Sequence, residues 1–182
     1  MTMTTGKSPA VPINLDTDNE VNFSDPGGDD FAALSRDRVA IRSLEARDLP
    51  ALIVIDRRLT GHARGDYYAQ KVDEALNVSG VRVSLVAEDD VGVTGFIMAR
   101  VDYGEFGQTE PQAVIDTIGV DPGHRGEQIG TALLSQLLAN LRALRVDSVR
   151  TELSWDQFGL MAFLARHDFR PSQRLALRRV LD

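Results

Sequence analysis

The chain has 182 residues, and 43% of them are hydrophobic, which suits one domain with an ordinary core. It contains no cysteine, which excludes disulfides, thiolate metal sites and a cysteine-linked acyl intermediate. Its net charge of -7 argues against nucleic acid or an anionic membrane as partner, because both require a basic surface. No apolar run reaches the roughly 18–20 residues that span a bilayer, and no signal peptide is recognisable, so we expect a cytoplasmic protein.

The first part of the chain differs in composition from the rest. Residues 1–30 carry one lysine and six acidic residues, so -5 of the net charge of -7 lies there. Large apolar side chains are scarce over the same stretch, which leaves little to bury in a core. We therefore expect residues 1–36 to form a flexible acidic tail, either a solvated extension or a docking segment for a partner. Residues 37–182 are expected to form the folded domain.

Apolar periodicity predicts the elements of this domain. Val81, Val83 and Leu85 alternate with other residues as in a strand, whereas Ile129 and Leu133 begin an i+4 stripe typical of an amphipathic helix. In chain order, the pattern predicts a strand at 38–42, helices at 49–60 and 65–77, a hairpin of strands at 81–87 and 91–101, a strand at 113–120, a helix at 129–144, a strand at 148–153, a helix at 158–166, and one or two strands at 169–180. This order predicts an α/β fold with a mixed sheet and helices on both faces.

The segment between the strand ending at Val120 and the helix starting at Ile129 is rich in glycine. The first N–H groups of a helix have no intrahelical partner, and the helix dipole is positive there. Gly126 and Gly130 allow an anion to approach the backbone, and Arg125 adds a fixed positive charge. This combination predicts a cradle for a diphosphate. The Gly-Lys-Ser/Thr sequence of a P-loop is absent, and the glycine spacing does not fit a dinucleotide-binding fingerprint.

These residues resemble the signature of the GNAT superfamily of acyl-CoA N-acyltransferases, V-x-P-x-x-R-G-x-G-I-G-x-x-L-L. Here it reads Val120-x-Pro122-x-x-Arg125-Gly126-x-Gln128-Ile129-Gly130-x-x-Leu133-Leu134. The order of predicted elements is also similar to that family over residues 38–180. Gln128 is a departure, because the family usually has glycine at this position.

The resemblance implies a central mixed, mostly antiparallel sheet with helices on both faces and a splayed pair of parallel strands. It also implies acetyl-CoA as cosubstrate. The backbone of Ile118, Gly119 and Val120 would pair with the pantetheine, and the diphosphate would lie against Arg125, Gly126, Gln128, Ile129, Gly130 and Thr131. No metal is expected, because the three histidines have no ligand spacing.

The reaction implied by the resemblance is transfer of an acetyl group from acetyl-CoA to a primary amine. With no cysteine available, direct transfer in a ternary complex is favoured. Asp116 is the first candidate for the general base, or else it caps or forms an ion pair within the sheet; Glu152 is a second candidate. Leu164 stands where many members of the family have a tyrosine that protonates the leaving thiolate. The thiolate would then leave unassisted or take a proton from water. The alternative hypothesis is a non-catalytic acyl-CoA-binding regulatory module.

The acceptor is expected to be a small molecule or a protein amine. Its surface would involve residues 103–110 and the start of the helix at 65–77, where Arg64, Tyr67 and Tyr68 cluster. Trp155 would line the thioester pocket or pack in the core. A homodimer through a C-terminal edge strand is possible.

Overall fold

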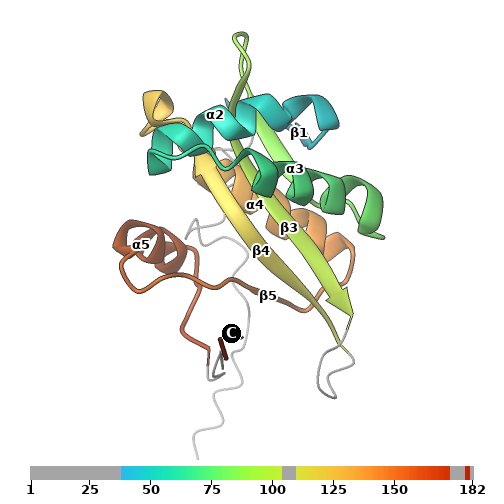
Figure 1. Cartoon of the computed structure of the whole chain (residues 1–182). Coiled ribbons are helices and arrows are strands. Elements are labelled where there is room, and N and C mark those ends of the chain that lie inside the picture. The colour runs from blue at the N-terminus through green and yellow to red at the C-terminus, as the bar shows by residue number, and fades with distance from the viewer. Residues whose placement is uncertain (1–37, 104–109, 173–178, 181–182) are drawn as a thin grey trace, which may run out of the picture.

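The computed structural model describes residues 38–103, 110–172 and 179–180. The tail expected at 1–36 lies outside these residues. One five-stranded sheet organises the described chain, with the strand order β1-β2-β3-β4-β5 (Figure 1). Neighbouring strands from β1 to β4 are antiparallel, whereas β5 is parallel to β4. The prediction of a mixed, mostly antiparallel sheet is therefore confirmed.

The strands of this sheet are β1 (Ala40–Ser43), β2 (Leu85–Glu88), β3 (Val93–Tyr103), β4 (Pro111–Val120) and β5 (Ser148–Arg150). The helices are α2 (Leu49–Thr60), α3 (Gly65–Asp73), α4 (Ile129–Ala143) and α5 (Phe158–Arg166). Three short helical segments accompany them, namely η1 (Ala46–Asp48), η2 (Glu74–Val78) and η3 (Pro122–His124). None of the helices described is both long and apolar enough to cross a membrane.

Four predicted elements differ from those observed. The strand predicted at 81–87 is β2, which begins only at Leu85. The helix predicted at 65–77 is α3 followed by η2, a turn of wider π-helical geometry. The strand predicted at 148–153 is only three residues long, because the chain leaves the sheet after Arg150. Of the strands predicted at 169–180, residues 173–178 lie outside the described chain, and the described residues on either side form no strand.

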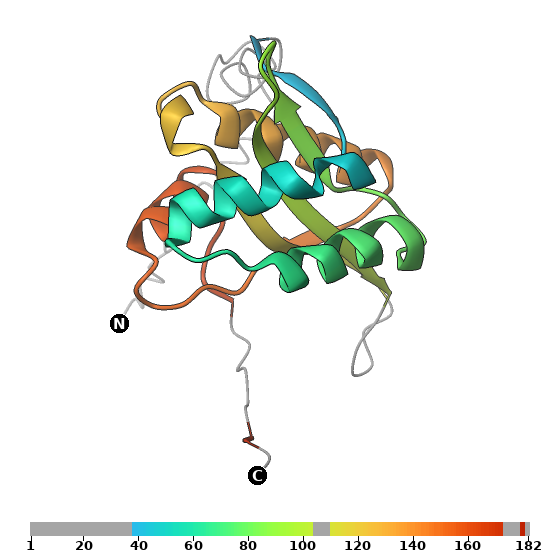
Figure 2. The same cartoon turned by 45° about the horizontal axis from the view of Figure 1, so that its top comes forward.

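The helices cover both faces of the sheet, as predicted. α2 and α3 lie on one face and α4 lies on the other, which is seen most clearly in the second view (Figure 2). Alternate residues of β3 point to opposite faces, as in any strand. Ile97 packs in the cluster that contains α4, whereas Phe96 and Met98 pack with α2 and α3. The sheet therefore separates two hydrophobic clusters.

The helix α4 lies very close to the sheet. Its predicted i+4 stripe of Ile129, Leu133, Leu137 and Leu141 is buried, which confirms the periodicity. Gly95 of β3 makes the close approach possible. A Cβ at Gly95 would lie 2.8 Å from Cγ2 of Ile129 and 3.2 Å from Cδ1 of Leu133.

The variant Gly95→Ala tests this close approach. The added methyl group forces α4 away from β3, and overpacking of this kind costs about 1–3 kcal/mol. We expect the free energy of unfolding in urea to fall by that amount. Gly80→Ala is the matched control, because a Cβ at Gly80 meets nothing within 4 Å. Equal stability of the two variants would contradict the tight packing of α4 on the sheet.

Candidate active site

The parallel strands β4 and β5 part soon after they meet. Their register covers only Gln112 to Val114 in β4 and Ser148 to Arg150 in β5. One further contact follows, in which the Thr151 hydroxyl donates to the Ile115 carbonyl at 2.9 Å. Beyond it, residues 116–120 of β4 face no partner strand on that side within the described chain. The predicted splay is therefore present, and Ile118, Gly119 and Val120 lie along it.

A β-bulge lies at the point where the strands part. Met98 pairs with Thr117 and Ala99 pairs with Ile115, so Asp116 is an extra residue in β4. A bulge breaks the regular alternation of a strand and changes the direction of a side chain. This places Asp116 on the wall of a cavity beside the open edge of β4.

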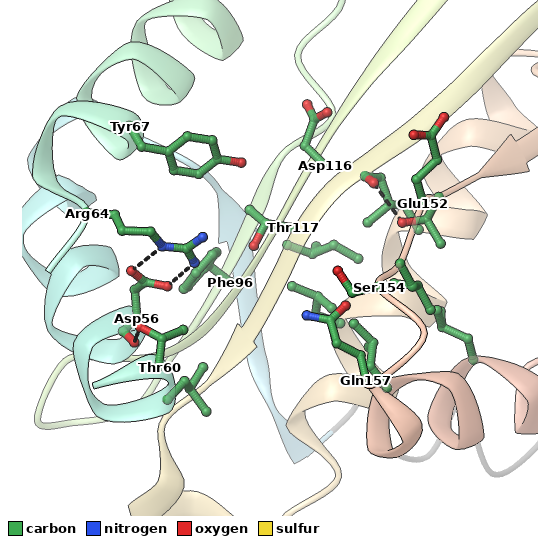
Figure 3. Close-up of a pocket in the computed structure, with 18 of the residues that line it drawn as sticks. Asp56, Thr60, Arg64, Tyr67, Phe96, Asp116, Thr117, Glu152, Ser154 and Gln157 are labelled. Atoms are coloured by element: carbon green, nitrogen blue, oxygen red, sulfur yellow. Dashed lines mark hydrogen bonds and ion pairs between the residues drawn. The ribbon is translucent and has the colours of Figure 1, made fainter. Parts of the chain in front are cut away.

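This cavity, which we call the central cavity, has a volume of about 440 Å³. Its walls come from α2, α3, β3, β4, α4, residues 151–154, residue 157 and α5. Figure 3 shows Tyr67 on one side, Asp116 and Thr117 on β4, and Glu152, Ser154 and Gln157 on the opposite side. A volume of this size lies within the range of small-molecule sites, roughly 300–1,000 Å³.

A buried carboxylate fixes the helical wall of the cavity. Asp56 of α2 is 2% exposed and accepts hydrogen bonds from Arg64 Nε at 3.0 Å and from the Tyr68 hydroxyl at 3.1 Å. The hydrogen bond from Arg64 lowers the pKa of Asp56, so the carboxylate stays charged. Burial raises the pKa of Tyr68 to about 12, so its hydroxyl remains a hydrogen-bond donor. Arg64 also lies over the Tyr67 ring, 5.3 Å from its centroid.

The sequence prediction identified the cationic and aromatic part of this wall but missed Asp56. Arg64, Tyr67 and Tyr68 all line the cavity, as expected of an acceptor surface. The signal for Asp56 was its place on the apolar face of α2, one residue after Ile55. Residues 104–109 of the second expected acceptor segment lie outside the described chain.

The two candidate bases line the same cavity but have different environments. Asp116 is 16% exposed; Arg100 donates to its Oδ1, and Lys71 Nζ lies 3.7 Å from its Oδ2. The ion pair considered as the alternative role of Asp116 is therefore present. Glu152 is 76% exposed and accepts a hydrogen bond from Arg150 at 3.1 Å. Asp116 is thus held between two cations, whereas Glu152 is open to solvent.

The helix α5 contributes no hydroxyl group that could donate a proton in the cavity. Leu164 is buried and lines the cavity at the position where a tyrosine was considered. Asp168, which follows α5, adopts φ +63°, the left-handed conformation that glycine favours. Trp155 is 88% exposed, so the expectation that it packs in the core was wrong, and it does not line this cavity.

The loop after β4 is anchored from both sides. The Asp121 N–H donates to the Thr94 carbonyl at 2.8 Å. Its carboxylate accepts a hydrogen bond from the Gly123 N–H at 2.9 Å and one from Arg58. The Gly123 N–H lowers the pKa of Asp121, which keeps the carboxylate charged. These contacts fix the path of the chain from β4 towards α4.

The residues predicted to hold a diphosphate lie at the end of this loop and in the first turn of α4. Arg125 and Gly126 are exposed, and Gly126 has φ +89°. The Ala132 N–H donates to the Gln128 carbonyl, so the N–H groups of Ile129, Gly130 and Thr131 precede the helical ladder. Gly130 is beside Val120, because a Cβ there would lie 3.7 Å from the Val120 Cγ2. The end of β4 and the start of α4 therefore lie side by side.

Gln128 adopts the left-handed conformation, with φ +58°, immediately before α4. This explains the usual glycine at the position, because left-handed backbone costs other residues about 1–2 kcal/mol. Within the described chain, no three histidine, aspartate or glutamate side chains gather where they would hold a metal ion.

Two substitutions test this backbone strain. Gln128→Gly relieves the strain but makes the unfolded chain more flexible, so we expect its free energy of unfolding to stay within about 0.5 kcal/mol of the wild type. Gln128→Val places a β-branched side chain in the same conformation and should cost about 1–2 kcal/mol. Urea denaturation measures both values. A valine variant as stable as the glycine variant would contradict the left-handed conformation.

Comparison with known proteins gives a family and a fold. A sequence model described as "Acetyltransferase (GNAT) family" matches residues 40–169. A search of curated proteins returned no match. The structure is similar to an aminoglycoside N-acetyltransferase AAC(6')-Iy in complex with CoA, with 16% identity, a TM-score of 0.66, and coverage of 78% of this chain and 94% of that one.

Two further solved structures are similar. An acetyltransferase from Trypanosoma brucei has 21% identity and a TM-score of 0.61, with coverage of 78% of this chain and 99% of the other. A transcriptional regulator from Bacillus halodurans C-125 has 15% identity and a TM-score of 0.63, with coverage of 79% and 99%. Such low identities show the fold alone. The family match extends over most of the chain and includes the splayed strands and the loop before α4; the chain belongs to the GNAT acetyltransferase family, whose cosubstrate is acetyl-CoA.

Proposed function

We propose that this protein transfers the acetyl group of acetyl-CoA to a primary amine on a small molecule. The observation that carries this proposal is the central cavity, which is lined by residues 115–118 of β4 at the place where β5 has parted from β4. Its volume suits a small acceptor. The similarity to an aminoglycoside N-acetyltransferase supports a small-molecule amine over a protein amine.

The cosubstrate would lie along the open edge of β4. Ile118, Gly119 and Val120 would offer backbone N–H and C=O groups to the pantetheine, much as a neighbouring strand does. The first turn of α4, from Gln128 to Thr131, would hold the diphosphate together with Arg125 and Gly126. Bound in this way, acetyl-CoA supplies the thioester to the cavity.

The acceptor would enter from the side of α2 and α3. Arg64 and Tyr68 are fixed by Asp56, and the Tyr67 ring lies beneath Arg64, so this wall is rigid before any ligand binds. A rigid wall lowers the entropy cost of holding the amine in line with the thioester. The chain has no cysteine, so the acetyl group passes directly to the amine in a ternary complex.

We assign the general base to Glu152 and a positioning role to Asp116. Both oxygens of Asp116 face cations, Arg100 and Lys71, which leaves neither turned towards an ammonium group. Glu152 lines the same cavity and keeps most of its carboxylate in solvent, where it can accept a proton directly or through water. Because Leu164 offers no proton, the thiolate would take one from water.

A non-catalytic acyl-CoA-binding module is the second candidate function, and Leu164 is the observation that favours it. A panel of primary amines, including aminoglycosides, separates the two candidates by release of free CoA thiol from acetyl-CoA. We expect amine-dependent thiol release at a rate well above hydrolysis. Tight binding of acetyl-CoA without release across the panel would refute the enzyme and support the binding module.

The matched variants Glu152→Gln and Asp116→Asn test the assignment of the base. Loss of a general base typically lowers turnover by roughly 10²–10⁴-fold. We expect Glu152→Gln to lower kcat about a hundredfold. Its kcat/KM should keep rising with pH, because the amine must then lose its proton to solvent. Asp116→Asn should lower kcat without changing the shape of the pH profile. The reverse pattern would make Asp116 the base.

A further inference from the structure

The C-terminal end of α5 contacts the first turn of α4. Nε2 of His167 lies 3.3 Å from Oγ1 of Thr131. The His167 ring also packs against Phe163, with 4.8 Å between ring centroids. Phe163 in turn lies against Gly130, where a Cβ would be 3.5 Å from its ring. Phe163 and His167 therefore pack together against the first turn of α4, which contains Gly130 and Thr131.

We propose that His167 is a positioning residue for the CoA diphosphate and acts through the Thr131 hydroxyl. The His167 Nε2–H donates to Oγ1 of Thr131, and the Thr131 hydroxyl then donates its own proton to a diphosphate oxygen. This inference rests on the proposed function, in which the first turn of α4 holds the diphosphate.

The assignment follows from the single proton of a hydroxyl group. A threonine in a helix readily donates this proton to a backbone carbonyl three or four residues earlier. If Thr131 did so, only oxygen lone pairs would face the diphosphate, and they would repel it. When the Nε2–H of His167 donates to Oγ1, it occupies one lone pair of that oxygen and holds the Thr131 hydroxyl beside α5. The hydroxyl proton of Thr131 is then available to a diphosphate oxygen.

The surroundings of His167 suit a neutral donor. The charged groups that act on it are Arg166 and Asp168, its two neighbours in the chain, while Thr131 and Phe163 pack against its ring. Burial, followed by the charge of Arg166, lowers the pKa of His167. The ring is therefore neutral near neutral pH, and a neutral ring with its proton on Nε2 is the donor that the mechanism needs.

Two amide variants separate donation from packing. The side-chain nitrogen of glutamine in His167→Gln can reach the place of Nε2, whereas the shorter side chain in His167→Asn cannot. We measure the Kd of CoA by titration calorimetry for both variants, for Thr131→Val and for the double variant Thr131→Val/His167→Asn.

The loss of a hydrogen bond to a charged group should raise the Kd of CoA about tenfold in His167→Asn and in Thr131→Val. His167→Gln should stay near the wild type, and the double variant should bind no more weakly than Thr131→Val alone. Independent, multiplied losses in the double variant would overturn the proposal.

A truncated donor tests whether the effect belongs to the diphosphate. S-acetylpantetheine lacks the diphosphate, so His167→Asn should leave its kcat/KM unchanged while lowering that of acetyl-CoA. An equal loss with both donors would assign His167 a packing role only. If His167→Asn does not fold, Thr131→Val decides, since a Kd for CoA within about twofold of the wild type refutes the proposal. A wild-type protein that fails to bind CoA would refute the proposed function instead.

Discussion

The site depends on how briefly β5 pairs with β4. Three register pairs and the hydrogen bond from Thr151 to the Ile115 carbonyl hold the strands together, and then the chain turns away. A longer β5 would pair with residues 116–120 and close the central cavity. The early end of a strand therefore leaves backbone hydrogen-bonding groups unused within a folded sheet, and an extended ligand can pair with them. The bulge at Asp116 interrupts the pairing of β4 with β3 just beyond the last β4–β5 pair, and the pairing with β3 resumes at Thr117.

The start of α4 lies next to this open edge, and we propose that it recognises the charge of the diphosphate. Asp121 ties the loop after β4 to Thr94 and Arg58, so the loop enters α4 from a fixed direction. The left-handed backbone at Gln128 then turns the chain into the helix. Backbone geometry, more than any single side chain, shapes the surface that we propose for the diphosphate. This is consistent with glutamine in place of the usual glycine, because its N–H group remains.

Periodicity and the glycine-rich loop were sufficient to predict much of this architecture. The i+4 stripe of α4 and the hairpin of β2 and β3 were predicted because each depends on residues close in the chain. The splay was predicted through the family resemblance carried by residues 120–134. The short length of β5 was not predicted, because it depends on where the chain leaves the sheet and apolar residues continue to Leu153.

Features that depend on contacts between different elements could not be predicted from the sequence. The bulge at Asp116 exists only relative to the pairing partner of β4, so no local pattern marks it. The contact between Asp56 and Arg64 joins two helices, and its only local sign was a carboxylate on the apolar face of α2. The ion pairs of Asp116 with Arg100 and Lys71 likewise join residues of different elements, and no local pattern marks them.

The sheet separates the hydrophobic cluster around α4 from the one beneath α2 and α3. The surface proposed for acetyl-CoA is built on α4, and the surface proposed for the acceptor is built on α2 and α3. Substitutions in distant, separately packed regions usually have additive effects. Evolution can therefore alter α2 and α3 to accept new amines while the α4 side stays constant. A fold divided in this way can gain new acceptors while its binding of the acetyl donor stays unchanged.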